Sequence, residues 1–244
     1  MIEAQNLKKQ FKNVVAVNGV SFSASVGEVV GFLGANGAGK STTMRLLTGF
    51  LELDSGNIRI FGNDMGKQCL KAQILIGYLP ESASGFPHLT VYEFLKFVGE
   101  ARGLRDTILE SAIQNVSANI ELLPAINKPL ADLSKGWRQR AWLAQALIHD
   151  PPILILDEPT DGLDPLQKNT VRRLIKRIAA EKIIIISSHI LEEAEEVCDR
   201  IIIINDGRIV VDKPKDQLID KEGNLAPMFE QLVKNAQPDQ INSS

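Results

Sequence analysis

This sequence of 244 residues has two cysteines and no excess of positive charge, and these two features argue against several classes of protein. The two cysteines, Cys69 and Cys198, lie far apart and fit no metal-ligand spacing, so we expect ordinary thiols of a reducing compartment. The formal net charge is −3, and lysine and arginine are spread along the chain. No basic stripe therefore indicates a nucleic-acid partner.

Long apolar runs are also missing. The longest aliphatic runs, residues 183–186 and 201–204, are far below the roughly 20 residues that a membrane-spanning helix needs. The first residues, Met-Ile-Glu-Ala, show no basic-then-apolar leader. We therefore expect a cytoplasmic protein with no membrane span of its own, so that work at a membrane would need another chain. The hydrophobic content of 44% is ample for the core of a large α/β domain.

A glycine-rich segment at 34–41 reads Gly-Ala-Asn-Gly-Ala-Gly-Lys-Ser and fits the phosphate-binding pattern G-x-x-x-x-G-K-[ST] in full. An apolar run at 29–33 precedes it and helix formers follow at 42–47, so we expect it between a strand and a helix. Such a segment holds a polyphosphate on backbone N–H groups, where the helix dipole adds roughly half a positive charge. Lys40 would reach the β- and γ-phosphates, and Ser41 would ligate Mg²⁺. The predicted nucleotide-binding residues are Gly34, Ala35, Asn36, Gly37, Ala38, Gly39, Lys40, Ser41 and Thr42.

The rest of the chain alternates strands and helices around a helical block. Apolar patterning predicts strands at 2–4, 14–17 and 20–24 with a turn at 17–19, and strands at 57–61, 74–79, 153–156, 183–187, 201–204 and 208–211 with a turn at 61–64. It predicts a helical segment from residue 90 to about residue 147, whose last helix, at 136–149, has Asp132 or Ser134 as its cap. It also predicts helices at 165–180, 191–198, 216–220 and 225–234. We therefore predict an α/β fold with a small N-terminal antiparallel sheet and an inserted all-helical block.

Two carboxylates, Asp157 and Glu158, directly follow the aliphatic run at 153–156, which is typical of a strand buried on both faces. Ligands of open α/β sheets bind at that end of the strands. One carboxylate can hold the Mg²⁺ that Ser41 also contacts, and the other can orient a water for attack on the γ-phosphorus. The alternative is a cap for the next helix, but capping does not require two acids after four buried aliphatic residues.

Three further stretches indicate which class of nucleotide-binding protein this is. Residues 133–140 read Leu-Ser-Lys-Gly-Trp-Arg-Gln-Arg, residues 161–165 read Asp-Gly-Leu-Asp-Pro, and residues 187–189 read Ser-Ser-His. Together with the glycine-rich segment and the carboxylate pair, these five ordered motifs resemble the nucleotide-binding subunit of ABC transporters. The resemblance covers about residues 2 to 213.

The resemblance implies a fold and an activity. The fold is an ABC ATPase domain at 1–213, with a RecA-like P-loop NTPase core, a mostly parallel sheet and a helical subdomain at about 82–149. A C-terminal helical extension and polar tail occupy 214–244. The activity is ATP hydrolysis that powers a separate membrane permease from the inner face of the cell membrane. The working unit is a head-to-tail homodimer with two ATP molecules between its subunits.

The resemblance also implies roles for single residues within one subunit. Phe11 would stack on the adenine, although a partly buried surface role is nearly as well supported for this phenylalanine. Asp157 would lie near Mg²⁺, and Glu158 would be the general base that acts with Lys40. His189 would contact the γ-phosphate, the alternative for a histidine at a strand end being a structural hydrogen bond.

Other implied roles cross the dimer interface. Ser134 and Gly136 would bind the γ-phosphate of the nucleotide that the opposite subunit holds, and Asp164 would link the two sites. The family's signature usually reads Leu-Ser-Gly-Gly-Gln, but here Lys135 replaces the first glycine and Trp137 replaces the glutamine. Because the serine and the second glycine remain, we expect ATP binding across the dimer to survive.

Glu81 is a further departure, since the family has a glutamine at that place. Its carboxylate would repel the γ-phosphate unless Mg²⁺ or water lay between them, which puts its role as a metal contact in doubt. The departures resemble the branch that works with ABC-2 permeases, which are typically bacterial exporters of drugs, ions, lipids or polysaccharides. Two other functions stay open: a soluble ABC ATPase, and an ATP-gated regulatory module that works without a permease. The transported substrate is selected by the permease and is not encoded here.

Overall fold

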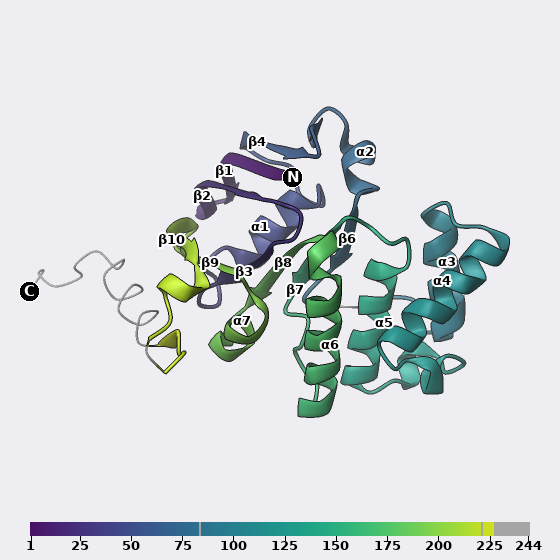
Figure 1. Cartoon of the computed structure of the whole chain (residues 1–244). Coiled ribbons are helices and arrows are strands. Elements are labelled where there is room, and N and C mark those ends of the chain that lie inside the picture. Colours follow the sequence, from purple (N-terminus) through teal and green to yellow (C-terminus); the bar gives the residue numbers. More distant parts are fainter. Residues whose placement is uncertain (83, 221, 227–244) are drawn as a thin grey trace, which may run out of the picture.

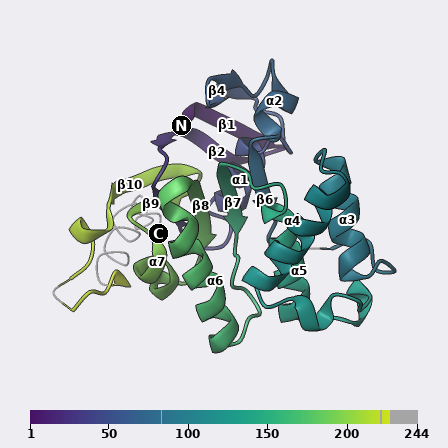
Figure 2. The same cartoon turned by 45° about the vertical axis from the view of Figure 1, so that its right-hand side comes forward.

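Two β-sheets form the framework of the molecule, and a group of helices lies to one side of them (Figure 1 and Figure 2). The computed structural model describes residues 1–82, 84–220 and 222–226. A mainly parallel sheet, an N-terminal antiparallel sheet and an inserted helical block are all present, so the predicted α/β fold class is confirmed.

The larger sheet has six strands in the order β10-β9-β3-β8-β7-β6. Neighbouring strands from β9 to β6 are parallel, and β10 is antiparallel to β9. The strands are β3 (Val29–Leu33), β6 (Ile76–Leu79), β7 (Ile153–Asp157), β8 (Ile183–Ser188), β9 (Arg200–Asn205) and β10 (Arg208–Pro214). Every residue of β3, β7 and β8 is buried, as expected for parallel strands that are covered on both faces.

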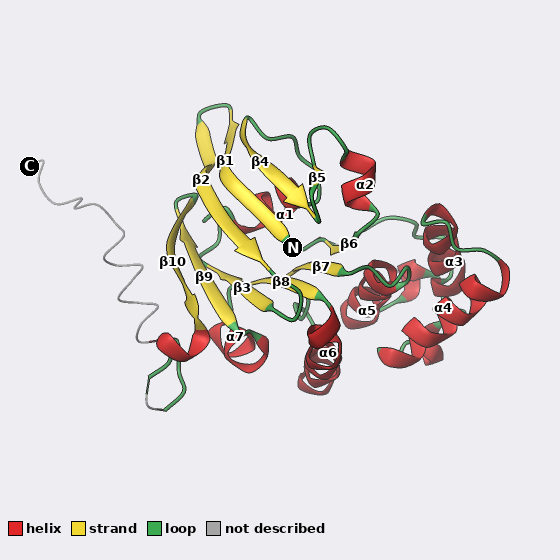
Figure 3. Cartoon of the chain, turned by 45° about the horizontal axis from the view of Figure 1, so that its top comes forward, coloured by secondary structure: helices red, strands yellow, loops and turns green. Residues whose placement is uncertain are grey.

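The smaller sheet is antiparallel, in the order β2-β1-β4-β5 (Figure 3). Its strands are β1 (Ile2–Phe11), β2 (Val14–Ala24), β4 (Ser55–Ile60) and β5 (Asn63–Asp64). Helix α1 (Lys40–Leu47) lies between the two sheets, where Met44 and Leu46 share one core with Phe22 of β2 and Phe32 of β3. Those two rings pack edge to face with centroids 5.0 Å apart. The glycine-rich segment that precedes α1 is therefore fixed between both sheets.

Helices cover the other face of the larger sheet. Side chains of α5 (Lys135–Leu147), α6 (Pro165–Ile178) and α7 (Leu191–Val197) share a core with β3, β7, β8 and β9. Helices α3 (Val91–Ala101) and α4 (Asp106–Asn119) pack outside α5 and complete the helical block between β6 and β7. Thr90 and Glu93 form a capping box at the start of α3. The remaining short helices are α2 (Cys69–Gln73), η1 (Leu123–Ala125), η2 (Leu130–Asp132), η3 (Ala179–Glu181) and η4 (Lys215–Gln217).

The N-terminal sheet corrects one local prediction. The turn predicted at 17–19 is wrong, because β2 runs through this stretch and β1 continues to Phe11. Gly19, at φ +84°, is the extra residue of a bulge, since Val20 pairs with Leu7 and Asn18 pairs with Lys8. An asparagine-glycine pair therefore marks a bulge inside a strand here, and not its end.

Other boundaries also differ from prediction. The strand predicted from residue 74 begins at Ile76, because residues 74 and 75 form the turn that ends the unpredicted helix α2. The turn predicted at 61–64 is partly strand, since Asn63 and Asp64 pair with β4. Ser134 caps α5, whereas Asp132 lies in the preceding 3-10 turn.

The C-terminal predictions lie at the limit of the described residues. A single 3-10 turn, η4, stands where a helix at 216–220 was predicted. The predicted helix at 225–234 lies outside the described residues beyond residue 226, as does the polar tail. Among the residues that the structure describes, no helix has both the length and the apolar character needed to cross a membrane.

Candidate functional site

Three of the predicted motifs converge at the C-terminal edge of three adjacent strands. Strands β3, β8 and β7 are neighbours and parallel, so the residues that follow them meet at one edge of the sheet. Leu33, which precedes the glycine-rich segment, pairs with Ser188, and Ser187 pairs with Asp157. The sheet register therefore brings the glycine-rich segment together with two motifs that lie more than a hundred residues further along the sequence.

The glycine-rich segment passes close to the backbones of β9 and β2 before α1 begins. A Cβ atom at Gly34 would lie 2.4 Å from the Ile204 carbonyl oxygen, and one at Gly39 would lie 2.4 Å from the Ala16 carbonyl oxygen. Gly39 also has a φ of +107°, a conformation that favours glycine. No side chain caps α1, and its first turn has no acidic residue, so its N-terminal N–H groups face a space suited to an anion.

Lys40 closes this segment into a loop. Its Nζ donates hydrogen bonds to the carbonyl oxygens of Gly34, at 2.7 Å, and Ala35, at 3.1 Å. Burial lowers the pKa of the Lys40 ammonium, although the carboxylates of Glu158, Asp157 and Glu81 act against this effect. A cavity of about 180 Å³ lies beside Lys40, lined by Ala16, Asn36, Gly37, Gly39, Lys40, Ser41, Thr42, Glu81 and Glu158.

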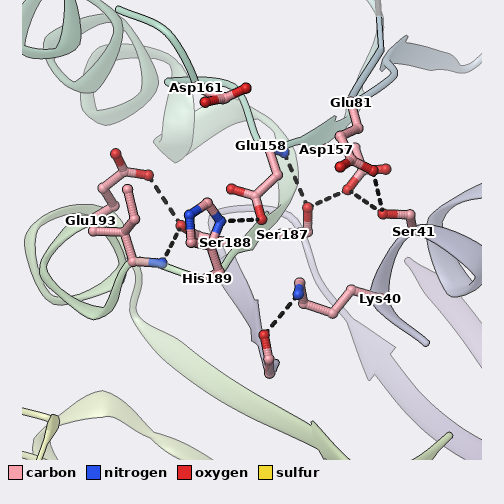
Figure 4. A network of polar contacts seen from close by, with 12 residues as sticks. Lys40, Ser41, Glu81, Asp157, Glu158, Asp161, Ser187, Ser188, His189 and Glu193 are labelled. Carbon is pink, nitrogen blue, oxygen red and sulfur yellow. Dashed lines mark hydrogen bonds and ion pairs between the residues drawn. The ribbon is translucent and has the colours of Figure 1, made fainter. Parts of the chain in front are cut away.

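Ser41 lies between two carboxylates (Figure 4). Its Oγ is 3.2 Å from both Asp157 Oδ1 and Glu81 Oε2, so one hydroxyl proton is shared by two acceptors. The Asp157 Oδ1 atom also accepts a short hydrogen bond from Ser187 Oγ. Burial raises the pKa of Asp157, and the Ser187 and Ser41 hydroxyls oppose this rise.

The oxygen atoms around Ser41 fit a hard divalent cation. Asp157 Oδ2 is buried and lacks a hydrogen-bond partner in the described part of the chain, and a buried polar atom of this kind is usually satisfied. Hydroxyl and carboxylate oxygens are the donors that Mg²⁺ prefers. No group of three or more His, Cys, Asp or Glu side chains forms a metal site within the described residues. A cation here would therefore need phosphate oxygens or water to complete its coordination.

Glu158 has an unusual backbone and a fixed side chain. Its φ of +52° is uncommon for a residue other than glycine, and such a conformation persists only where its surroundings hold it. The Glu158 N–H donates to Ser187 Oγ at 3.1 Å, and Gln139 Nε2 donates to the Glu158 carbonyl oxygen at 3.1 Å. His189 Nδ1 lies 2.9 Å from Glu158 Oε1. Burial raises the pKa of Glu158, and the contact with His189 opposes this rise.

A second set of hydrogen bonds holds the loop that carries His189. Ser188 Oγ donates to Glu193 Oε2 at 3.1 Å and accepts the N–H of Ile190 at 3.0 Å. The Glu193 carboxylate is buried and also pairs with Lys168 Nζ at 2.8 Å. Sequence reasoning missed these anchors, although Ser188 stands next to His189 in the motif. The pairing of Glu193 with Lys168 joins two helices and leaves no signal in the sequence.

Four of the predicted residues that do not line the cavity beside Lys40 also lie outside the glycine-rich loop and the ends of β7 and β8. Ser134 and Gly136 lie at the start of α5, and Asp164 caps α6 through the N–H of Gln167. Phe11 ends β1 with its side chain exposed, and Lys9 Nζ lies 5.7 Å from its ring centroid. Within one chain the cavity therefore combines the glycine-rich loop with Glu81 and Glu158, and leaves the signature residues at a separate place.

Comparisons with known proteins agree with this arrangement. The family described as ABC transporter matches residues 17–161. The linearmycin resistance ATP-binding protein LnrL of Bacillus subtilis is 37% identical over 91% of this chain and 72% of that protein. The Nod factor export ATP-binding protein I of Burkholderia lata is 35% identical over 91% of this chain and 73% of that protein. The ABC transporter ATP-binding protein NatA of Bacillus subtilis is 36% identical over 91% of this chain and 93% of that protein.

Solved structures show the same fold. An ATP-binding subunit of an ABC transporter superposes with a TM-score of 0.87 at 29% identity, covering 95% of this chain and 99% of that one. A dimeric ATP-binding cassette in a post-hydrolysis state, bound to ADP and phosphate, superposes with a TM-score of 0.82 at 24% identity, covering 88% and 98%. The second likeness concerns the fold alone.

Proposed function

The chain belongs to the ABC transporter family and is an ATPase, and we propose that two copies of it close on ATP. This closure would drive a separate membrane permease that exports its substrate. The observation that carries the proposal is the carboxylate of Glu158, which is held at the edge of the cavity that Lys40 and Ser41 line. The ATPase unit that we propose spans 1–213, with the helical subdomain at about 82–149 and an extension at 214–244.

The proposed chemistry rests on positioning and charge, because phosphoryl transfer needs little covalent help from protein. The N–H groups at the start of α1 and the Lys40 ammonium would bind the β- and γ-phosphates, with Lys40 exchanging its carbonyl partners for phosphate oxygens. Ser41, Asp157 and Glu81 would hold Mg²⁺, which when bound neutralises charge on the phosphate oxygens.

Glu158 would act as the general base. Its Oε2 atom would accept a proton from the attacking water, while Oε1 stays on His189 Nδ1. Nε2 of His189 is directed away from Glu158, and with a proton on each ring nitrogen it would donate a hydrogen bond to the γ-phosphate. The raised pKa of Glu158 makes it a stronger base than an exposed glutamate.

The signature residues would complete the site from a second copy. Ser134 and Gly136 lie outside the cavity of their own chain, and the N-terminus of α5 has no acidic residue in its first turn. A head-to-tail dimer would place this helix terminus against the partner's γ-phosphate, where its N–H groups and dipole favour an anion. Asp164 would then lie at the interface and connect the two sites.

An exposed apolar groove supports the proposal that the chain binds a partner protein. It has a volume of about 660 Å³, lies between the α2 region and α3, and includes the exposed side chains of Phe50, Leu70, Ile74 and Phe97. Large apolar side chains that gather on a surface mark interaction sites more often than isolated ones do. A permease segment that projects from the inner face of the membrane would fit this groove. Two similar proteins named above are designated for resistance to linearmycin and for Nod factor export, which supports export as the direction.

Co-purification from membranes tests the proposal. A tagged chain should bring down a protein with several membrane spans, and the assembled complex should hydrolyse ATP faster than the chain alone. Recovery of soluble partners only would favour a soluble ABC ATPase. A complex that binds ATP without turnover would favour an ATP-gated regulatory module.

A further inference from the structure

An ion pair joins the signature segment to the loop that follows β7. Lys135 Nζ lies 2.7 Å from Asp161 Oδ2, and Lys135 is the first residue of α5. We propose that this pair fastens residues 134–136 to residues 158–161, so that Lys135 and Asp161 are positioning residues that couple the two sites of the dimer. The inference rests on the proposed function, in which residues 134–136 bind the partner's nucleotide.

The two segments fit closely in shape as well as in charge. The stem of Lys135 lies against the backbone of Gly162, since a Cβ atom there would be 2.4 Å from Lys135 Cδ. A Cβ atom at Gly136 would similarly lie 2.5 Å from Gln167 Oε1. Gly162 also has a φ of +73°, which favours glycine. Lys135 is therefore held by packing along its stem and by Asp161 at its tip.

A second hydrogen bond links the same face of α5 to Glu158. Lys135 and Gln139 are four residues apart, so their side chains share one face of the helix. Lys135 binds Asp161, and Gln139 Nε2 donates to the Glu158 carbonyl oxygen at 3.1 Å. The two contacts hold both ends of the segment 158–161. A shift of α5 toward a partner's phosphate would therefore move the backbone of Glu158 with it.

The charges explain why Lys135 needs its partner. A cation in the first turn of a helix is opposed by the helix dipole, and Asp161 offsets that cost. Without Lys135, the Asp161 carboxylate would stand beside residues that meet an incoming phosphate. The side chains of Lys135 and Asp161 are 67% and 43% exposed, and exposed pairs contribute little to folding stability. Variants of this pair should fold, and their effects should appear in the ATPase cycle.

A double-mutant cycle tests the pair in the full-length chain. Lys135→Met and Asp161→Asn should each lower kcat about five- to tenfold and change KM for ATP less than about twofold, because positioning of Glu158 affects the chemical step. The combined variant should be no slower than the slower single variant, and Lys135→Arg should keep the parental rate. As a control, Arg172→Met breaks the ion pair of Arg172 with Glu196, at 2.9 Å between α6 and α7, and should leave kcat unchanged.

The outcomes separate this inference from the proposed function. Multiplying effects in the combined variant would overturn the inference, since residues that act independently have additive free energies. A slow Lys135→Met together with a parental Asp161→Asn would also overturn it and would assign Lys135 to the nucleotide itself. A parent chain that neither pairs nor hydrolyses ATP would overturn the proposed function and the inference together. A parent that does both, with additive variants, overturns the inference alone.

Discussion

His189 Nδ1 lies 2.9 Å from Glu158 Oε1, which joins an imidazole at the end of β8 to a carboxylate that follows the neighbouring strand β7. The two side chains have different surroundings, since that of His189 is 48% exposed and that of Glu158 is 9% exposed. Burial alone would favour the neutral acid, and the histidine contact favours the carboxylate. His189 therefore orients Glu158 and favours its ionised form.

Replacing His189 tests this role. His189→Ala should lower kcat by about 10²-fold, at the lower end of the range for loss of acid–base assistance, and should leave ATP affinity within about threefold. Steady-state ATPase assays with a direct nucleotide-binding assay measure both quantities. His88→Ala is the matched control, because His88 has no predicted role and should keep the parental rate. An unchanged kcat in His189→Ala would show that Glu158 does not depend on this contact.

Asp157 should lower the stability of the nucleotide-free chain near neutral pH. Burial raises the pKa of Asp157, so the folded chain favours the neutral acid. The stability of the folded chain is therefore greatest below the unfolded pKa of about 3.9, and it falls as pH rises through the folded pKa and the buried group ionises. Asp157→Asn removes the ionised group and should raise Tm near neutral pH by about 2–4 °C for each kcal/mol regained. The gain should shrink toward pH ~4, where the parent acid is also neutral.

Asp54 provides a control of opposite sign. A hydrogen bond from Lys9 lowers the pKa of Asp54, so this group contributes stability above its unfolded pKa. Asp54→Asn should therefore give no rise in Tm near neutral pH. Thermal unfolding followed across the pH range compares the two variants. A lower Tm for Asp157→Asn near neutral pH would contradict the stated balance of burial and hydrogen bonding.

Phe11 should bind the base of the nucleotide rather than its phosphates. Phe11→Ala should weaken ATP binding by about 5- to 150-fold, which corresponds to roughly 1–3 kcal/mol for one stacked base. Binding of inorganic tripolyphosphate, which has no base, should be unchanged. Phe61→Ala removes another exposed phenylalanine, in the turn between β4 and β5, and should affect neither ligand. Equal loss of both ligands in Phe11→Ala would point to damage of the glycine-rich loop instead.

The apolar groove should be needed for membrane association. Phe97→Glu places a charge among the exposed apolar side chains of the groove and should abolish co-purification with a permease, while intrinsic ATPase activity stays within about twofold. Ile108→Glu is the matched control, because Ile108 is exposed on α4 outside this groove. Retained co-purification of the Phe97 variant would move the permease contact to another surface.

The parts of the site that the sequence predicts are those that lie within one short segment. The glycine-rich loop, the pair Asp157 and Glu158, and the cap at Ser134 each follow from residues adjacent in sequence. Periodicity also identified the buried strands and the helical block, because burial on one or both faces imposes a repeat. The sequence does not distinguish the bulge at Gly19 from a turn, since an asparagine-glycine pair is common in both settings.

The contacts that hold the site together could not be predicted in this way. Ser187 binds Asp157, and Gln139 binds the carbonyl of Glu158, only because the order of strands and the packing of α5 bring them together. The pairing of Lys135 with Asp161 likewise depends on where α5 begins relative to the loop after β7. The sequence marked Lys135 as a departure from the signature, and the fold supplied its partner.

The central claim is that two copies of the chain close on ATP and that Glu158 then removes a proton from water. Glu158→Gln keeps the shape of the side chain and removes its basicity, so turnover should fall by about 10²- to 10⁴-fold, or roughly 3–5 kcal/mol on the barrier. ATP should remain bound between two copies of this variant. Replacing Ser134 by arginine in the same background should prevent this pairing, because the signature segment would no longer admit the partner's phosphate.

The most direct test is the molar mass of the Glu158→Gln variant in solution, measured by light scattering with and without ATP and Mg²⁺. One chain has a mass of 26.8 kDa. We predict that this mass doubles when ATP is added and returns to that of one chain in the Ser134→Arg background. A variant that binds ATP yet keeps the mass of a single chain, or that hydrolyses ATP at the parental rate, would contradict the account.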